Sequence, residues 1–255
     1  SRTRKLNPRF CSTHPLASNP SSNSSFVVFF RTSKVFGKYP IDLVDSRLTF
    51  CSLLESFSLG EVVCIADNAT DEQSFFFARN AHHFYRSSKG NSGSFRLAVD
   101  LVTLHPADIY YFVEDDHLHL PRQKSFLAAG LKCFDFVSLY DHPDKYQSRC
   151  YPGLQRQVFA TSVGHFSTSP STVMTFACRS ETLYRAREIM LDPAFTGQAL
   201  KAPRDHEMFI ALAEAGFTLG TALPGRSTHC ERELLSPYVD WSAYALSLAS
   251  KYRLF

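Results

Sequence analysis

Acidic residues are missing from the first part of this chain of 255 residues. Neither Asp nor Glu occurs before Asp42, while residues 1–41 carry seven Lys and Arg side chains. With 27 basic and 24 acidic residues in all, the other 214 residues carry 20 basic and 24 acidic side chains. A nucleic-acid-binding domain is expected to show a basic face in its folded part. The basic excess lies at the N-terminus instead, so we expect no nucleic-acid partner.

Paired cysteine motifs and long apolar runs are also missing. The seven cysteines include no Cys-x-x-Cys pair, and their number is odd. This pattern favours reduced, mostly buried thiols in a cytoplasmic protein. No apolar run approaches the length of about 20 residues that crosses a bilayer.

The composition changes after residue 25. Residues 1–25 are rich in Ser, Asn and Pro and contain four basic residues. We interpret them as a flexible leader or linker with no part in the chemistry, a transit-like segment being the alternative. At 44% hydrophobic residues, the chain can bury the core of one large α/β domain, which we place at residues 26–234. The aromatic tail, residues 235–255, is expected to pack on that domain, with a dimer contact or a peripheral membrane contact as alternatives.

Apolar runs of strand length alternate with helical patterns from residue 26 onward. Buried strands are predicted at Phe26–Phe30, Val62–Ala66 and Ile109–Val113. Helices are predicted at Asp42–Phe57, after the capping box Thr70–Gln73, where Phe75–Phe77 would enter the core, and at Ser94–Thr103. This alternation predicts an α/β fold with a mostly parallel sheet that is covered by helices on both faces.

Polar side chains follow each of these strands. Arg31 and Thr32 follow the first strand, Asp67 follows the second, and Glu114–Asp116 follow the third. Ligands of parallel sheets bind outside the carboxyl ends of the strands, so we expect these residues on one rim. Asp67 could bind a nucleobase imide or a ribose, or instead form an Asx turn or a helix cap. Arg31 could face a diphosphate, or lie in solvent.

The three adjacent carboxylates of Glu114, Asp115 and Asp116 end an apolar run abruptly. Like charges this close repel one another, so burial in a sheet would not stabilise them. A hard divalent cation would, and Mg²⁺ or Mn²⁺ takes only one or two protein carboxylates when phosphates and water supply the other ligands. The alternative is an acidic loop after a core strand.

The order of the motifs resembles the GT-A nucleotide-sugar domain of family 2 glycosyltransferases. The segments that carry the resemblance are Arg31-Thr32, Asp67–Asp71, Gly90–Gly93, Tyr111–Pro121 and the later Arg204–Gly216. The match covers about residues 26–230. It departs from the family at Glu114, where the metal motif usually begins with Asp, and at Arg204, where the base motif usually has Glu. The resemblance implies a GT-A, Rossmann-like fold with a central, mostly parallel sheet.

The resemblance also implies a donor site and a bound Mn²⁺ or Mg²⁺. Asp116 would hold the cation against the two donor phosphates. His229 lies where several GT-A families place a late histidine that completes the metal shell or contacts the phosphates, the alternative being a hydrogen-bonded histidine with no ligand role. Asp115 would face the ribose or sugar hydroxyls, because neighbours on an extended segment point opposite ways. The donor-binding residues expected from these motifs are Arg31, Thr32, Asp67, Asn91, Glu114 and Asp115.

The resemblance places the general base at Asp205, with Glu207 as the second choice. A carboxylate serves as base if it comes within about 3 Å of the acceptor oxygen. Asp205 also precedes an amphipathic stretch, Met208–Ala215, and could be the N-cap of a helix there. Hydroxyl residues in Phe166–Ala177 could line the acceptor side, or form an ordinary Ser/Pro loop.

Three functions remain as hypotheses. The first is a metal-dependent transfer of sugar from a nucleoside-diphosphate sugar to a hydroxyl of a glycan or other acceptor, with inversion. The second is a nucleotidyl- or phosphotransferase with the same metal and diphosphate chemistry, which would be expected to carry a Gly-rich loop near the first strand; Phe26–Lys38 holds one glycine, Gly37. The third is a non-catalytic carbohydrate-binding relative, against which the carboxylates at 115, 116 and 205 argue.

Overall fold

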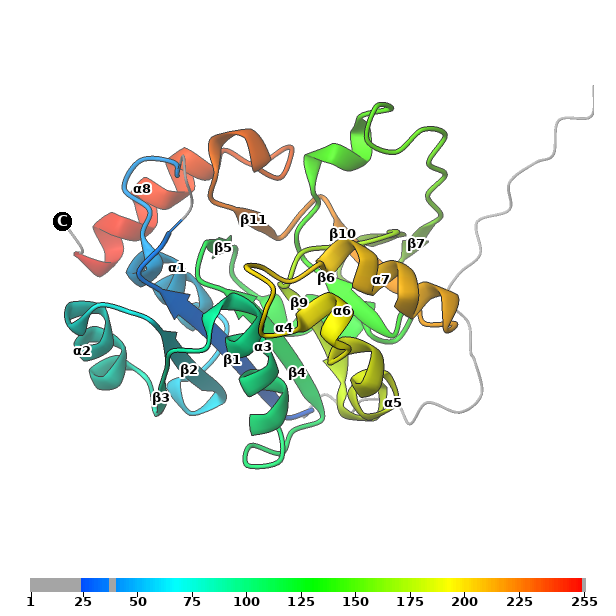
Figure 1. The fold of residues 1–255 in the computed structure, drawn as a ribbon. Coiled ribbons are helices and arrows are strands. Elements are labelled where there is room, and N and C mark those ends of the chain that lie inside the picture. The colour runs from blue at the N-terminus through cyan, green and yellow to red at the C-terminus, as the bar shows by residue number, and fades with distance from the viewer. Residues whose placement is uncertain (1–23, 37–39, 254–255) are drawn as a thin grey trace, which may run out of the picture.

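The computed structural model describes residues 24–36 and 40–253, and a nine-stranded sheet forms its centre (Figure 1). The sheet strands are β1 (Phe26–Ser33), β2 (Val62–Asp67), β3 (His83–Ser87), β4 (Ile109–Glu114), β6 (Phe136–Ser138), β7 (Val158–Ala160), β8 (His165–Thr168), β9 (Phe176–Arg179) and β10 (Leu219–Leu223). Their order is β3-β2-β1-β4-β9-β6-β10-β8-β7. Strands β3, β2, β1 and β4 are parallel, as are β6 and β10, while the other pairings are antiparallel. Residues 1–23 of the predicted leader or linker, residues 1–25, lie outside the described residues.

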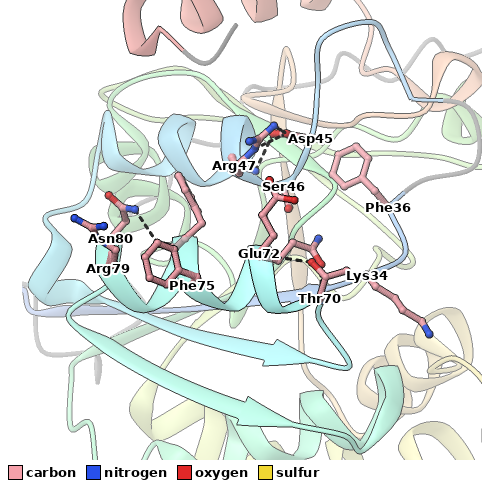
Figure 2. Close-up of a pocket in the computed structure, with 12 residues that line it drawn as sticks. Lys34, Phe36, Asp45, Ser46, Arg47, Thr70, Glu72, Phe75, Arg79 and Asn80 are labelled. Atoms are coloured by element: carbon pink, nitrogen blue, oxygen red, sulfur yellow. Dashed lines mark hydrogen bonds and ion pairs between the residues drawn. The ribbon is translucent and has the colours of Figure 1, made fainter.

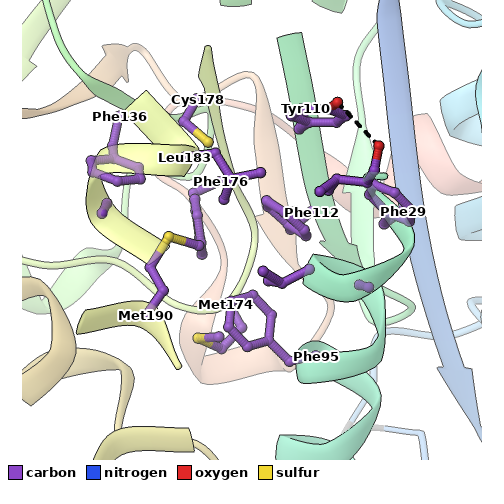
Figure 3. Packing of buried hydrophobic residues seen from close by; sticks show 14 of the residues in the cluster. Phe29, Phe95, Tyr110, Phe112, Phe136, Met174, Phe176, Cys178, Leu183 and Met190 are labelled. Atoms are coloured by element: carbon purple, nitrogen blue, oxygen red, sulfur yellow. Dashed lines mark hydrogen bonds between the residues drawn. The ribbon is translucent and has the colours of Figure 1, made fainter. Parts of the chain in front are cut away.

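Helices cover both faces of the sheet, as the alternation predicts. The helices are α1 (Ser46–Leu54), α2 (Asp71–Asn80), α3 (Gly90–Leu101), α4 (Gln123–Gly130), α5 (Ser180–Met190), α6 (Pro193–Thr196), α7 (Asp205–Glu214) and α8 (Trp241–Tyr252). On one face, Phe95 of α3 and Leu183 of α5 pack with Phe29, Phe112 and Phe176 of the sheet (Figure 3). Helices α1, α2 and α4 cover the other face. The central strands are apolar on both sides because neither side meets water.

The start of α1 differs from the prediction of a helix over Asp42–Phe57. The helix begins at Ser46, because the Asp45 side chain accepts hydrogen bonds from the amides of Arg47 and Leu48 and caps it there.

The capping box at α2 is confirmed. The Thr70 hydroxyl accepts from the Gln73 amide, and the Gln73 side chain accepts from the Thr70 amide. The prediction that the whole run Phe75–Phe77 enters the core is wrong at its first position. Phe77 is buried, but Phe75 is 64% exposed, because residues two apart on a helix face different directions.

Two further differences lie between α2 and α3. The edge strand β3, His83–Ser87, was not predicted, since its side chains are only partly buried and mixed in polarity. Helix α3 begins at Gly90 rather than at Ser94, and the Asp67 carboxylate accepts a hydrogen bond from the Gly90 amide.

A separate two-stranded ladder stands at the carboxyl end of β4. Its strands are β5 (His117–His119) and β11 (Ser227–His229), which pair antiparallel and place His117 opposite His229. Helix α8 packs beside α1 (Figure 1), where Trp241 and Leu248 meet Leu48 of α1 and Leu118 of β5. Within the described residues, no helix has both the length and the apolar character needed to cross a membrane.

Close packing between β10 and the loop before β6 leaves no room for a side chain at Gly220. A Cβ built there would lie 2.2 Å from Cδ2 of Phe134, a side chain in the core. We predict that Gly220→Ala lowers the free energy of unfolding by about 1–3 kcal/mol, the usual effect of overpacking, as measured by urea denaturation. The control is Gly60→Ala, since nothing lies within 4 Å of its added Cβ. It should change stability by no more than about 1 kcal/mol, and an equal loss in both variants would contradict the packing argument.

Candidate active site

Polar side chains from several strands lie along the carboxyl edge of the sheet. The parallel pairing places Ser33 beside Asp67 and Arg31 beside Glu114. Strand β1 runs through Ser33, so Arg31 and Thr32 belong to the strand rather than to the turn after it. The ends of β1, β2 and β4 therefore meet at one rim.

Asp116 and His229 meet above this rim. The His229 Nε2 atom lies 3.0 Å from Asp116 Oδ2, and His117 Nδ1 lies 2.9 Å from Asp116 Oδ1. The amide of Glu231 donates to His229 Nδ1 at 3.2 Å, so the proton of the neutral ring is on Nε2. Hydrogen bonds in the β5–β11 ladder hold these residues together although they are more than 100 positions apart in the sequence.

The charges of Asp116 and His229 stabilise one another. Burial alone would raise the pKa of the Asp116 carboxyl, but the hydrogen bonds from His117 and His229 hold it well below its usual value. Burial opposes the charged form of His229, while the hydrogen bond to Asp116 raises the pKa of its ring above the ordinary value. Asp116 is therefore an ionised carboxylate beside an imidazole, and its side chain is 21% exposed.

This pair fits an open metal site better than a closed one. Among the described residues, no group of three or more His, Cys, Asp and Glu side chains has the arrangement of a metal site. A catalytic Mg²⁺ or Mn²⁺ needs only one or two protein side chains when phosphates and water complete its coordination. The carboxylate oxygen of Asp116 is a suitable donor, and Nε2 of His229 becomes one in the tautomer that carries the ring proton on Nδ1.

Asp115 points into the protein. Its Oδ2 atom accepts hydrogen bonds from the Thr32 hydroxyl at 2.7 Å and from the Ser33 amide at 3.1 Å. Burial, and then the charge of Asp116, raises the pKa of Asp115 to about 8. Thr32 and Asp115 thus join the ends of β1 and β4, and Asp116, one residue later, faces the other way.

Arg31 is buried rather than in solvent. It is 5% exposed, and its Nη1 atom donates to Asn91 Oδ1 at 2.8 Å and to the Asn91 carbonyl at 3.0 Å. Its Nη2 atom lies 3.2 Å from Glu114 Oε1, and the guanidinium stacks over Phe95. The Asn91 side chain is exposed and lies 3.5 Å from Glu114 Oε1. Arg31 therefore faces Asn91 and Glu114, which stand at the rim.

Asp67 is also enclosed. It is 4% exposed, and it accepts hydrogen bonds from the Ser87 hydroxyl, the Lys89 and Gly90 amides and the Asn68 side chain. These contacts join the end of β2 to the loop that precedes α3, so the carboxylate is satisfied within the protein.

Asp205 is the first residue of α7, and the prediction that it caps the helix is wrong. The N-cap is Arg204, and the Asp205 carboxylate accepts from the amide of His206 at 2.8 Å. Burial, and then the charge of Glu114, raises the pKa of Asp205 to about 6. Since Coulomb energies fall with distance, the effect of Glu114 indicates that it lies in the neighbourhood of Asp205. Glu207 lies on the same turn, is exposed, and adds to this shift.

The structure places further polar residues beside Asp205 that the motifs did not indicate. The His206 ring lies 3.1 Å from the Ser171 hydroxyl and 3.3 Å from the Tyr151 hydroxyl. The Lys145 ammonium donates to Tyr151 at 3.0 Å, and its side chain is only 4% exposed. Ser171 belongs to the loop for which an acceptor-binding role was an open alternative, whereas Lys145 and Tyr151 carry no local signal.

The predicted site residues do not line either of two cavities in the described part of the chain. A pocket of about 660 Å³ lies between α1, α2 and the segment after β1, and none of the predicted site residues lines it (Figure 2). A smaller cavity of about 380 Å³, lined by Asn68, Arg86 and Ser87 among others, opens beside Asp67 at the ends of β2 and β3.

Known proteins share the fold of this chain. No family model and no curated protein match its sequence. One similar solved structure is GalNAc-T7 with UDP, GalNAc and Mn²⁺, with a TM-score of 0.56 and 13% identity over 81% of this chain and 43% of that chain. Another is CMP-2-keto-3-deoxy-manno-octonic acid synthetase with CTP, with a TM-score of 0.52 and 12% identity over 91% of this chain and 100% of that chain. The chain therefore has the GT-A-like, Rossmann-like fold that the motif order predicts, and it spans less than half the length of GalNAc-T7.

The raised pKa of Asp205 has a consequence for stability. Because its pKa rises from 3.8 to about 6 on folding, the folded protein holds this proton more firmly than the unfolded chain. The free energy of unfolding should fall as the pH rises through this window, and Asp205→Asn cannot show that loss. We predict that Asp205→Asn gains stability relative to wild type between pH 4 and pH 7 in urea denaturation. A difference that is the same at both pH values would contradict this environment for Asp205.

Proposed function

We propose that this protein transfers a sugar from a nucleoside-diphosphate sugar to an acceptor hydroxyl with the help of a divalent cation. The observation that carries the proposal is the meeting of an ionised Asp116 with His229 at 3.0 Å. Asp205, whose pKa is raised by burial and by the charge of Glu114, supplies a second carboxylate for the reaction. A metal-binding pair and a carboxylate of raised pKa across one site are what transfer from a diphosphate donor requires. The GT-A-like fold supports this assignment.

Asp116 and His229 would hold the cation, and Mn²⁺ suits them better than Mg²⁺ because one donor is an imidazole nitrogen. When bound, the cation supplies positive charge that neutralises the leaving diphosphate. His117 occupies Oδ1 of Asp116, which leaves Oδ2 directed to His229. The Nε2 proton of His229 bonds to Asp116, so ligation through Nε2 would require the ring to carry its proton on Nδ1 instead, and the Glu231 amide to give up its hydrogen bond to Nδ1.

Asp205 is the proposed general base. Its pKa of about 6 leaves it ionised at neutral pH but makes it a stronger base than an ordinary carboxylate. It would take the proton of the acceptor hydroxyl as that oxygen attacks the anomeric carbon. A base on the face opposite the diphosphate implies one in-line displacement and inversion of configuration. Glu207, on the same turn, is the second choice.

The buried residues of the predicted donor site have supporting roles in this proposal. Arg31 holds Asn91 and Glu114 in place and neutralises one carboxylate of the acidic motif. Asp115 joins β4 to β1 through Thr32. Asn91 and Glu114, which stand at the rim, are the members of this group that are placed to contact the donor.

A nucleotidyl transfer is the second candidate, because the likeness to CMP-2-keto-3-deoxy-manno-octonic acid synthetase extends over the whole of that chain. That reaction would use the same cation and would not need a base at Asp205, so the variant of this residue separates the two functions.

The first functional prediction concerns the cation. In a thermal-shift panel of UDP-, GDP-, dTDP- and CMP-sugars, we expect one donor to stabilise the protein only when Mn²⁺ is present. Ligand at one hundred times its dissociation constant should add about 2.7 kcal/mol. Asp116→Ala should abolish this Mn²⁺-dependent shift and leave the unliganded protein folded.

The matched control for this test is Glu181→Ala, which removes a carboxylate that is 60% exposed on α5. It should retain the full shift. An Asp116→Ala protein that binds donor and Mn²⁺ as wild type does would remove Asp116 from the metal site.

The second functional prediction separates transfer from binding. Asp205→Asn should keep donor and Mn²⁺ affinity nearly unchanged and lower transfer by about 10²-fold or more, the usual contribution of a general base. The product linkage, assigned by NMR, should show inversion. Full turnover in the variant or retention of configuration would reject this role and turn attention to Glu207.

A further inference from the structure

Tyr146 is oriented in the reverse of the usual way for an exposed tyrosine. Such residues commonly rest the ring on apolar neighbours and leave the hydroxyl in water. Tyr146 is 53% exposed, yet its hydroxyl donates to Asp141 Oδ2 at 2.5 Å. The Asp141 side chain is fully buried. The hydroxyl end is therefore anchored inside the protein, and much of the ring lies in solvent.

A buried ion pair maintains this arrangement. The Arg156 Nη2 atom lies 3.3 Å from Asp141 Oδ1, and its guanidinium carbon lies 5.4 Å from the centre of the Tyr146 ring. Arg156 thus offsets the buried carboxylate and covers one face of the ring. A ring that stabilised the hydrophobic core would be buried, because exposed aromatic area adds little to stability. This ring is instead held rigidly with surface open to a ligand, which lowers the entropy lost on binding.

The turn that carries Tyr146 is fastened to both halves of the proposed site. This turn, η2 (Pro143–Tyr146), includes Lys145, which is bonded through Tyr151 to His206, the neighbour of Asp205. At the other end of the segment, the Tyr140 ring lies 5.3 Å from that of His117, which holds Asp116.

We propose that Tyr146 is the platform on which an acceptor sugar stacks, so that the acceptor is a saccharide with a pyranose ring. This inference rests on the proposed function. One face of a pyranose presents C–H groups, whose partial positive charge suits the negative face of an aromatic ring. Because Lys145 connects η2 through Tyr151 to His206 at the start of α7, a sugar stacked on Tyr146 would lie on the side of the site that carries Asp205.

The test measures sugar binding by the full chain without requiring turnover. Saturation-transfer NMR is run with methyl glycosides of glucose, galactose, mannose and N-acetylglucosamine. We expect wild type to transfer saturation to the ring C–H protons of at least one glycoside. Tyr146→Ala should weaken its binding by about tenfold or more. The control is Tyr184→Ala, which removes a ring that is 58% exposed on α5, and it should bind as wild type does.

The same variants are tested for donor binding with Mn²⁺, which separates the two proposals. Tyr146→Ala should keep the donor shift, which also shows that it is folded. Glycoside binding that is equal in Tyr146→Ala and wild type, or absent from wild type, overturns the platform and leaves the proposed function standing. If wild type binds none of the donors, the proposed function is overturned, and the acceptor role of Tyr146 with it.

Discussion

The hydrogen-bonded ladder between β5 and β11 is the constraint on which the candidate site depends. It places His229 opposite His117 and directs both rings at Asp116. Without this ladder, Asp116 would be one carboxylate in an acidic turn, with no partner from the distant part of the chain. The ladder is itself held in the protein, since the buried His119 bonds to Tyr111 at 2.7 Å and Leu118 packs against α1 and α8.

The three carboxylates of the acidic motif avoid mutual repulsion by facing three different partners. Glu114 faces Arg31, Asp115 faces the hydroxyl of Thr32, and Asp116 faces two imidazoles. Arg31 and the imidazoles offset the charges of Glu114 and Asp116, which would be costly to bury alone, while the pKa of about 8 leaves Asp115 mostly uncharged at neutral pH. Asp116 differs from the other two in that its partners are imidazoles and its side chain stays 21% exposed.

Local patterns predicted the elements whose side chains have one clear environment. The runs of β1, β2 and β4 are apolar on both faces, and Thr70 and Gln73 cap α2 through contacts only three residues apart. The edge strand β3 escaped prediction because its partial burial leaves no regular pattern. The helix start at Asp205 was misplaced, since capping depends on backbone angles that composition does not specify.

The sequence by itself determined that the polar groups would gather at the carboxyl edge, because parallel strands all end there. It also indicated the fold, through motifs whose order reflects that edge. Only the tertiary structure decided the partners of each group: Asp67 and Asp115 are turned inward and hydrogen-bonded within the protein, while Asp116 stays partly exposed beside His229 and Asp205 begins α7. The reason is that hydrogen-bond partners come from segments far apart in the chain. The register of the β5–β11 ladder brings His117 opposite His229, and the turn η2 brings Tyr146 to Asp141. Neither contact is indicated by a motif in the local sequence.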